Sequence, residues 1–355
     1  MKAFKRHRDY GFFDQDIRLS KLSALGDPLE KLNAGIDFNI FRDLLETGLT
    51  KPIKGKGGRP PYDYVLMFKI LILQRYYNLS DDQTEYQIND RMSFMRFLNL
   101  TIADDIPDSK TVWLFREQLI NGDLIEPLFR LFVKELERLN LIVNEGKIVD
   151  ASFIEVPRQR NSRDENGQIK SGETPEAFKT NPNRLRQKDV DARWTKKNNQ
   201  TFYGYKVHVN SDRKHKLVVN YALTAASVHD TQPMDELVLQ SLAEGETLHG
   251  DSAYSGAGIA AVIGGKGMMG QICEKGYKNH PLDETQKANN KIKSSVRARV
   301  EHIFGFMEGS MGGMFQLAVG RNRITGIAGL MCLTYNLFRK VYLQPQVGIV
   351  CPVVA

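Results

Sequence analysis

The chain has 355 residues, of which 41% are hydrophobic and 26% charged, and its formal net charge is +7. This composition excludes a disordered chain and allows two domains, or three small ones, with buried cores. The positive balance favours a polyanionic partner, nucleic acid first, although ribosomal and membrane-surface proteins are also basic.

Cysteine usage and apolar runs predict a cytoplasmic protein with no membrane partner. The three cysteines are few and widely separated, which argues against a disulfide framework or a zinc site and fits a reducing cytosol. The basic start of the chain is not followed by an apolar region, so no secretory signal is expected. The longest apolar run, residues 326–338, is too short to span a bilayer and predicts a buried helix.

The first part of the chain predicts helices. Residues 1–60 form an N-terminal segment of mixed character that ends in a basic, glycine-rich linker, KPIKGKGGRPPYD. Residues 61–142 have a helical pattern, in which Ser80 with Gln83 predicts a capping box and Asp108 predicts another helix start. Short helices with scattered Arg and Lys resemble a helix-turn-helix module. Most three-helix segments do not bind DNA, so the pattern alone leaves DNA contact by these helices open.

Residues 143–341 predict a mixed α/β domain. Three strands come first, followed by a helix, a strand, a helix, a strand and a long helix. The predicted strands lie at 146–156, 201–210, 216–226, 246–250 and near 270–274. The tail, residues 342–355, shows no clear pattern.

A long polar insertion, residues 157–200, separates the first two predicted strands. It is rich in Arg, Lys, Asn, Asp and Glu and poor in apolar side chains. A loop of this length inside a compact domain is either functional or disordered.

Three carboxylates are candidates for chemistry. Asp150 is flanked by apolar residues on the first predicted strand, Asp251 follows a strand end, and Glu301 lies on the late helix. If they meet, each pair at 4 Å repels by about 4 kcal/mol at an effective dielectric constant near 20. Such a cluster either takes up protons or binds a hard cation, and oxygen ligands suit Mg²⁺ or Mn²⁺. The pattern alone leaves open whether the three residues meet.

The late helix carries Glu301 at the border of an apolar stripe. Five residues of the stripe share one helical face: Val296, Val300, Ile303, Phe304 and Met307. Glu301 lies about 100° round from Val300. Arg297, one turn earlier, is within ion-pair reach of Glu301. A solvated surface pair is the alternative interpretation of this spacing.

Several motifs in the same order resemble those of a bacterial DDE transposase of the insertion-sequence-five family, within the insertion-sequence-four-like group. The motifs are KIVDASFIEVP, ARWTKKNNQTFYGYKVHVNSD, AASVHD, HGDSAYSG and SSVRARVEHIFGFM. The resemblance runs from about residue 60 to residue 340. It implies a ribonuclease H-like catalytic core behind the helical domain, and it favours DNA binding by that domain, residues 61–142. It also implies that Asp150, Asp251 and Glu301 are the catalytic, metal-binding acids.

The resemblance also implies a reaction, cofactors and partners. Two divalent ions, Mg²⁺ or Mn²⁺, would activate water at a phosphodiester, and the freed 3′ end would then be joined to target DNA. The partners would be double-stranded DNA, namely the element's terminal inverted repeats and the target. The protein would act as a homodimer or higher oligomer associated with the bacterial nucleoid.

Four residues are predicted to contact DNA. Arg297 matches the arginine of the family's Tyr-Arg-Glu-Lys signature and would contact a phosphate or orient Glu301. Trp194, Lys196 and Lys197 place an aromatic side chain beside two cations, which suits a DNA backbone or a flipped base, although the same run can be a solvated loop.

The signature is incomplete in this chain, because its tyrosine position holds Ser294 and its lysine position holds Glu308. This departure leaves two other interpretations open. One is a decayed or domesticated DNA-binding protein without catalysis. The other is a metal-dependent nuclease that cuts DNA without joining it.

Overall fold

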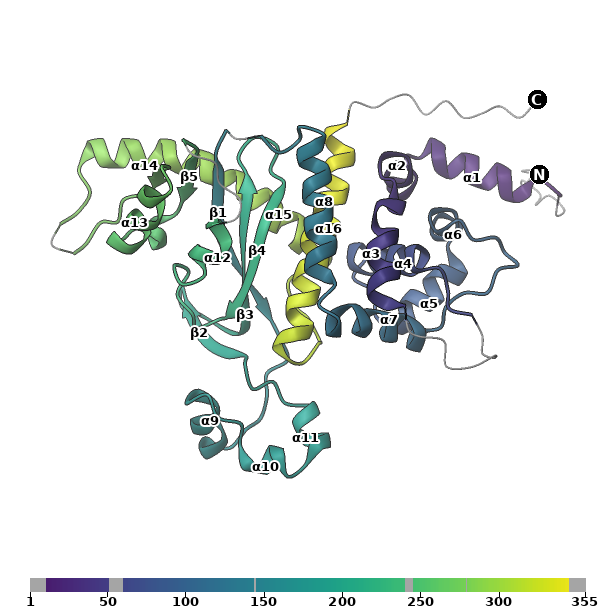
Figure 1. Ribbon diagram of the computed structural model, residues 1–355, viewed down its shortest axis with the longest axis horizontal. Helices are drawn as coiled ribbons and strands as arrows, with labels where there is room; N and C mark the ends of the chain where they lie inside the picture. Colours follow the sequence, from purple (N-terminus) through teal and green to yellow (C-terminus); the bar gives the residue numbers. More distant parts are fainter. Residues whose placement is uncertain (1–10, 51–59, 144, 240–244, 279, 345–355) are drawn as a thin grey trace, which may run out of the picture.

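The computed structural model describes residues 11–50, 60–143, 145–239, 245–278 and 280–344. Most of the predicted basic linker (51–59) and most of the tail (345–355) lie outside the described residues. Helices fill one side of the molecule and a mixed sheet the other, and the two are joined by the long helix α16 (Arg321–Leu343) (Figure 1).

The helical domain begins earlier than the pattern indicated, because the N-terminal segment is itself helical. Its first elements are α1 (Asp14–Ala24), α2 (Pro28–Gly35), η1 (Phe38–Phe41) and α3 (Arg42–Leu49). The later ones are α4 (Tyr64–Tyr76), α5 (Asp81–Asp90), α6 (Met92–Leu98), α7 (Ser109–Asn121) and α8 (Ile125–Arg138). Phe41 packs against Phe68 and Phe132, which ties the N-terminal segment into the same core.

Helix starts follow the predicted capping chemistry. Ser80 and Gln83 form the expected capping box at α5, with each side chain bonded to the other residue's backbone N–H. Asp108 accepts a hydrogen bond from the backbone N–H of Thr111 and caps α7.

The sheet has six strands within the described residues. They are β1 (Lys147–Glu155), β2 (Arg193–Lys197), β3 (Gln200–Asp212), β4 (Val218–Ala225), β5 (Thr247–Gly250) and β6 (Met269–Ile272). β3 pairs antiparallel with β1, β2 and β4, whereas β5 pairs parallel with β1, and β6 parallel with β5. The order β4-β3-β1-β5-β6, antiparallel first and then parallel, is that of a ribonuclease H-like core and confirms the fold prediction.

Alternation along β1 sends side chains to two separate cores. Val149 packs into a smaller core with α12 (Met234–Leu239) and α13 (Ala257–Gly265). Its neighbour Ile148 belongs to the main core. That core continues through α8 and α16, which lie side by side against the sheet in Figure 1, into the helical domain. The buried helix predicted for residues 326–338 is the middle of α16. No helix within the described ranges is both long and apolar enough to cross a membrane.

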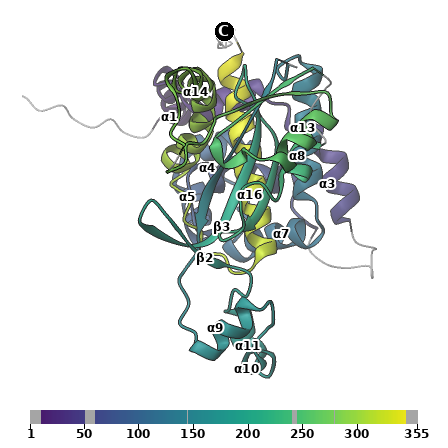
Figure 2. The same ribbon diagram turned by 90° about the vertical axis from the view of Figure 1, so that its left-hand side faces the viewer.

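Most of the polar insertion forms a small lobe, residues 157–192, that projects from the sheet domain (Figures 1 and 2). The lobe has three short helices, α9 (Arg163–Lys170), α10 (Glu176–Lys179) and α11 (Pro182–Arg186). Its small core is built round the fully buried Phe178. Asp189, also buried, fixes the lobe by accepting hydrogen bonds from the Tyr205 hydroxyl (2.6 Å) and the Gly320 N–H (3.0 Å). The insertion is therefore folded, and its last residues form β2.

Candidate active site

Asp150 lies in the middle of β1, on the face of the strand that it shares with Ile148 and Ile154. Its Oδ1 accepts a hydrogen bond from the N–H of Ala151 (2.9 Å). Its Oδ2 accepts one from the Arg297 guanidinium (2.8 Å), and only 16% of the side chain is exposed. The strand thus holds one carboxylate at the edge of an apolar core with a single cationic partner.

Asp251 comes directly after β5, the parallel neighbour of β1, so the ends of the two strands bring it towards Asp150. Its Oδ1 accepts a hydrogen bond from the N–H of Ala253 (2.8 Å) and so caps the short helix η2 (Ser252–Tyr254). The strand end and the cap together fix the direction of this carboxylate.

Glu301 follows two helical segments, α14 (Glu284–Arg297) and η3 (Ala298–Val300), and is the first residue of α15 (Glu301–Gly305). Val300, Ile303 and Met307 of the predicted stripe are buried in the main core. Glu301, at the border of that stripe, is 66% exposed. The structure thus confirms the stripe, although the expected long helix narrows to 3₁₀ geometry at η3 and widens to a π-helix at η4 (Phe306–Ser310).

Arg297 joins two of the predicted acids. Its Nη1 lies 2.8 Å from Asp150 and its Nη2 lies 3.6 Å from Glu301. The interpretation of Arg297 and Glu301 as a solvated surface pair is therefore incomplete, because Arg297 also binds a largely buried carboxylate 147 positions earlier in the chain.

The charges of the two aspartates affect each other. Burial raises the pKa of Asp150, and repulsion from Asp251 adds to the rise. The Ala151 N–H and the charges of Arg297 and Lys197 act in the opposite direction. Burial also raises the pKa of Tyr254, and the negative charges of Asp150, Asp230 and Asp251 raise it further. These carboxylates therefore share one region round Tyr254.

Sequence reasoning gave no role to several residues at this region. Lys206 on β3 forms an ion pair with Asp230 (2.5 Å), next to His208, whose Nε2 lies 2.8 Å from the Thr224 hydroxyl. Burial lowers the pKa of His208 to about 4, so this ring is neutral near pH 7. Lys206, His208 and Asp230 all occur in the motifs YGYKVHV and AASVHD, so the signal was present in the sequence.

The predicted DNA contacts fall in two places. Lys197, at the end of β2, lies near enough to Asp150 to lower the pKa of that carboxyl. Trp194, 49% exposed, lies beside Tyr203 and has the Arg158 guanidinium 5.4 Å from its ring. Lys196 is exposed on the same strand. Hence Lys197 belongs to the acidic region, whereas Trp194 faces the base of the lobe.

The three acids have the ligand chemistry that divalent ions prefer, but in the structure they are not close enough together to hold one. All three are carboxylates, the donors that Mg²⁺ and Mn²⁺ prefer, and the adjacent charges of Asp150 and Asp251 call for a cation. Within the ranges that the structure describes, however, no three His, Cys, Asp or Glu side chains are grouped closely enough to hold a metal ion. The guanidinium of Arg297 lies between Asp150 and Glu301. Metal binding at all three acids would therefore require Arg297 to move.

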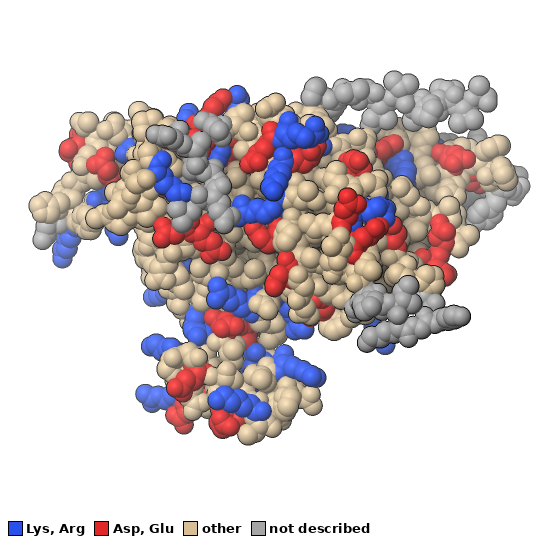
Figure 3. All heavy atoms as spheres, in the orientation of Figure 1, with Lys and Arg blue, Asp and Glu red and all other residues tan. Residues whose placement is uncertain are grey.

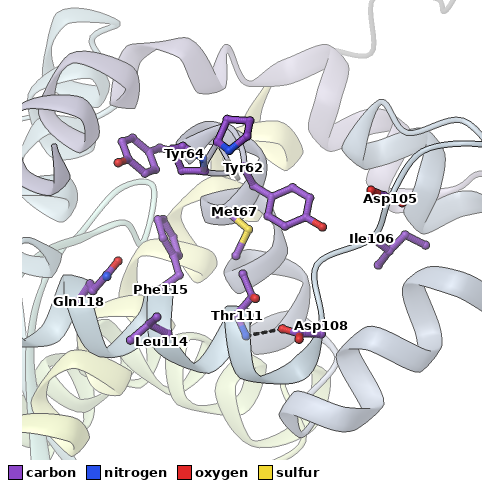
Figure 4. Close-up of a pocket in the computed structure, with 12 residues that line it drawn as sticks. Tyr62, Tyr64, Met67, Asp105, Ile106, Asp108, Thr111, Leu114, Phe115 and Gln118 are labelled. Carbon is purple, nitrogen blue, oxygen red and sulfur yellow. Dashed lines mark hydrogen bonds between the residues drawn. The ribbon is translucent and has the colours of Figure 1, made fainter. Parts of the chain in front are cut away.

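A pocket of about 420 Å³ in the helical domain is unrelated to these acids (Figure 4). Tyr62, Tyr64 and Phe115 line it together with two carboxylates, Asp105 and Asp108, and Figure 4 shows Asp108 bonded to the backbone of α7. No described Lys or Arg lines this pocket. It therefore lacks the charge that a nucleic acid site needs.

Comparison with known proteins gives matches over both halves of the chain. The family described as "Transposase DDE domain" matches residues 143–337, more than half of the chain, and the family "Transposase domain (DUF772)" matches residues 17–118. Among solved structures, the chain is similar to the piggyBac transposase in a cryo-EM structure of its synaptic complex with hairpin DNA. The identity is 11% and the TM-score 0.42, over 88% of this chain and 74% of that one.

Proposed function

Because this chain belongs to the transposase DDE domain family, we propose that it cleaves DNA at the ends of an insertion sequence and joins the 3′ ends to target DNA. Within that family we assign it to the insertion-sequence-five group, on the motifs of its sequence. The observations that support the proposal are that Arg297 contacts both Asp150 and Glu301, and that Asp251 acts electrostatically on Asp150, with the three acids coming from separate elements of a ribonuclease H-like core.

Asp150, Asp251 and Glu301 would hold the metal ions. Two divalent ions at this position would supply an activated water and would stabilise the leaving 3′ oxygen of the phosphodiester. The chain supplies the remaining elements of the site. Burial in β1 and capping at η2 fix the aspartates, and Lys197 offers a cation to a DNA phosphate beside them.

Arg297 would have two positions in this proposal. In the structure it lies between Asp150 and Glu301, and its single positive charge offsets one of their two negative charges. With metal ions bound to those carboxylates, its guanidinium would be free to bind a phosphate oxygen. The negative charge of the acids would thus be offset in part by Arg297 in one state and by the metal ions in the other.

The proposal includes DNA as the partner of both domains. We assign terminal-repeat binding to the helical domain and assembly into a homodimer or higher oligomer to the DNA-bound state, since an element has two ends to be joined. The molar mass of the protein, measured by light scattering with and without a terminal-repeat duplex, tests whether it assembles on DNA. A complex with one chain per duplex at all concentrations would contradict it.

A strand-transfer assay tests the chemistry. The full chain is incubated with Mg²⁺ or Mn²⁺ and duplexes that carry the repeats flanking its own gene. We expect joined products from the parent, and a loss of at least about 10³-fold in cleavage from Asp150→Asn, Asp251→Asn or Glu301→Gln, with DNA binding retained.

Glu284→Gln is the matched control for these variants. Glu284 is a carboxylate on α14 that pairs with Lys287 and is 91% exposed, so its removal should leave cleavage unchanged. Cleavage retained by Asp150→Asn would remove the acids from the mechanism. Cleavage without joined products would identify a nuclease, and binding without cleavage a silent DNA-binding protein.

A further inference from the structure

A second site lies where the helical domain, the sheet domain and the lobe meet. It is an open groove of about 760 Å³, called here the seam groove. Its walls come from the joint between α4 and α5, from α7, from residues 315–319 and the start of α16, and from Arg186 and Gln187 of the lobe. None of the three candidate catalytic acids lines it.

The seam groove has more positive than negative charge. Four arginines line it, but two of them are neutralised there: Arg116 pairs with Asp81 (2.6 Å) and Arg323 with Glu117 (2.8 Å). Within the described ranges, neither Arg75 nor Arg186 forms an ion pair with a carboxylate. The groove therefore has two spare positive charges, one on its floor and one on the lobe.

Arg75 is the more informative of the two. Its Nη1 donates to the neutral Gln316 side chain (2.9 Å), and its Nε is buried without a hydrogen-bond partner among the described residues. Burial lowers the pKa of Arg75 to about 10, repulsion from Arg116 acts in the same direction, and attraction by Asp81 opposes both. Asp81 lies near Arg75 but forms its ion pair with Arg116 (2.6 Å), so the partly buried guanidinium of Arg75 has no ion-pair partner of its own among the described residues, which is costly unless an anion accompanies it. The folded protein therefore carries this unfavourable free energy of the Arg75 charge next to an open groove.

The rim of the groove adds apolar surface. Trp113 is 44% exposed, Phe315 54% and Leu317 77%. Flat aromatic side chains next to guanidinium groups are the combination with which proteins bind nucleic acids, through phosphate and sugar–base contacts together. Figure 3 shows Lys and Arg side chains on the lobe and on the adjoining part of the sheet domain, interspersed with Asp and Glu. The pocket in Figure 4, by contrast, has carboxylates and no described cation.

We propose that the seam groove is a second binding site for duplex DNA, in which Arg75 and Arg186 bind backbone phosphates. This deepens the proposed function, since it rests on DNA being the substrate. It adds a contact made by the helical domain, the lobe and the start of α16 together, at a distance from the acids. A long polyanion fits the groove because the groove is open and its spare charges come from separate segments.

Binding of a 30-base-pair duplex of arbitrary sequence, measured by fluorescence anisotropy in EDTA at several salt concentrations, tests the proposal. We expect Arg75→Gln and Arg186→Gln each to weaken binding about tenfold. Each should also reduce the slope of log affinity against log salt by about one, as expected for a lost phosphate contact. Lys134→Gln, which removes an exposed charge of α8 outside the groove, is the matched control and should change both quantities less.

Thermal unfolding of the same proteins separates binding from folding. Arg75→Gln should unfold at the same or a higher temperature than the parent, because it removes an uncompensated buried charge. If Arg75→Gln proves unstable, Arg186→Gln decides, since Arg186 is exposed on the lobe. Affinities and salt slopes equal to those of Lys134→Gln for both variants would overturn the proposal. A loss confined to a single-stranded 30-mer would also overturn it.

This assay contains no metal and needs no catalysis, so its result is independent of the strand-transfer assay. The groove proposal can fail while the acids are shown to be catalytic. Equally, the acids can fail while the groove still binds DNA.

Discussion

Replacement of Arg297 by Gln tests the described geometry of the acidic site most directly. The variant leaves Asp150 with the Ala151 N–H as its remaining hydrogen-bond donor among the described residues. With charge centres about 4 Å apart and an effective dielectric constant near 20, the lost attraction is about 4 kcal/mol before other terms. Desolvation of the carboxylate offsets much of this, and the exposed fractions of the two side chains, 26% and 16%, admit screening by water. We expect a net coupling of about 1–2 kcal/mol.

A double-mutant cycle with Asp150→Asn measures that coupling. In metal-free buffer at low salt, Arg297→Gln should lower the free energy of unfolding by about 1–2 kcal/mol in the parent and by much less in the Asp150→Asn background. Asp150→Asn alone should be neutral or stabilising at pH 7. Because the pKa of Asp150 is raised in the folded state, ionisation of this carboxyl opposes folding above that pKa.

Glu301→Gln is the matched control in the cycle. Glu301 also contacts Arg297, but at 3.6 Å and with 66% of its side chain exposed, so its coupling should stay below about 0.5 kcal/mol. Urea unfolding followed by circular dichroism gives the four free energies of each cycle. A coupling of zero between Arg297 and Asp150, or one no larger than that between Arg297 and Glu301, would refute the described ion pair.

Three further predictions concern stability. Burial lowers the pKa of His208 from 6.5 to about 4, so the stability due to its neutral form is complete above pH 6.5 and is lost as the pH falls from 6.5 towards 4. His208→Gln should therefore flatten the plot of unfolding free energy against pH in this range. Parallel plots for the variant and the parent would contradict this. Asp189→Ala leaves the Tyr205 hydroxyl and the Gly320 N–H without their acceptor, so it should lower the free energy of unfolding by about 2–4 kcal/mol. It should also expose the lobe to limited proteolysis. Unchanged proteolysis would contradict the role of Asp189 in fixing the lobe. Gly329→Ala places a methyl group against the Tyr221 hydroxyl and 2.7 Å from Ile125 Cγ2. The free energy of unfolding should therefore fall by about 1–3 kcal/mol, measured as a lower melting temperature. Gly305→Ala, with open space at its Cβ, is the control and should leave the melting temperature unchanged.

The parts of the fold that depend on local pattern could be predicted from the sequence. The strands β1, β3, β4, β5 and β6 follow from runs of apolar and β-branched residues, and α5 and α7 from capping residues whose hydrogen bonds span three positions. The N-terminal helices α1 to α3 were missed because each is short, with 11, 8 and 8 residues. Their apolar side chains become a core only when Phe41 meets Phe68 and Phe132.

The candidate site shows the same division between local and long-range information. The positions of Asp150, Asp251 and Glu301 came from motifs, whereas the contact of Arg297 with Asp150 joins residues 147 positions apart. No periodic pattern of apolar residues in the sequence could predict this contact. The seam groove is a stronger case, since its spare charges, Arg75 and Arg186, belong to segments that the sequence assigned to a helical domain and to a polar insertion.

The two candidate DNA sites are connected by α16, which predicts how cleavage should depend on DNA length. Arg323, in the first turn of α16, lines the seam groove, and Tyr335 further along contacts His302, the neighbour of Glu301. At 1.5 Å per residue these positions are about 18 Å apart, which is about five to six base pairs at 3.4 Å each. A duplex that occupies the acids must therefore extend by at least that length before it reaches the groove. We expect Arg75→Gln to weaken cleavage of substrates with 20 or more base pairs on each side of the cut, and to have no effect when both sides are cut back to about four. An equal effect of Arg75→Gln on the short and the long substrates would mean that Arg75 acts on the catalytic core through the fold and does not bind DNA.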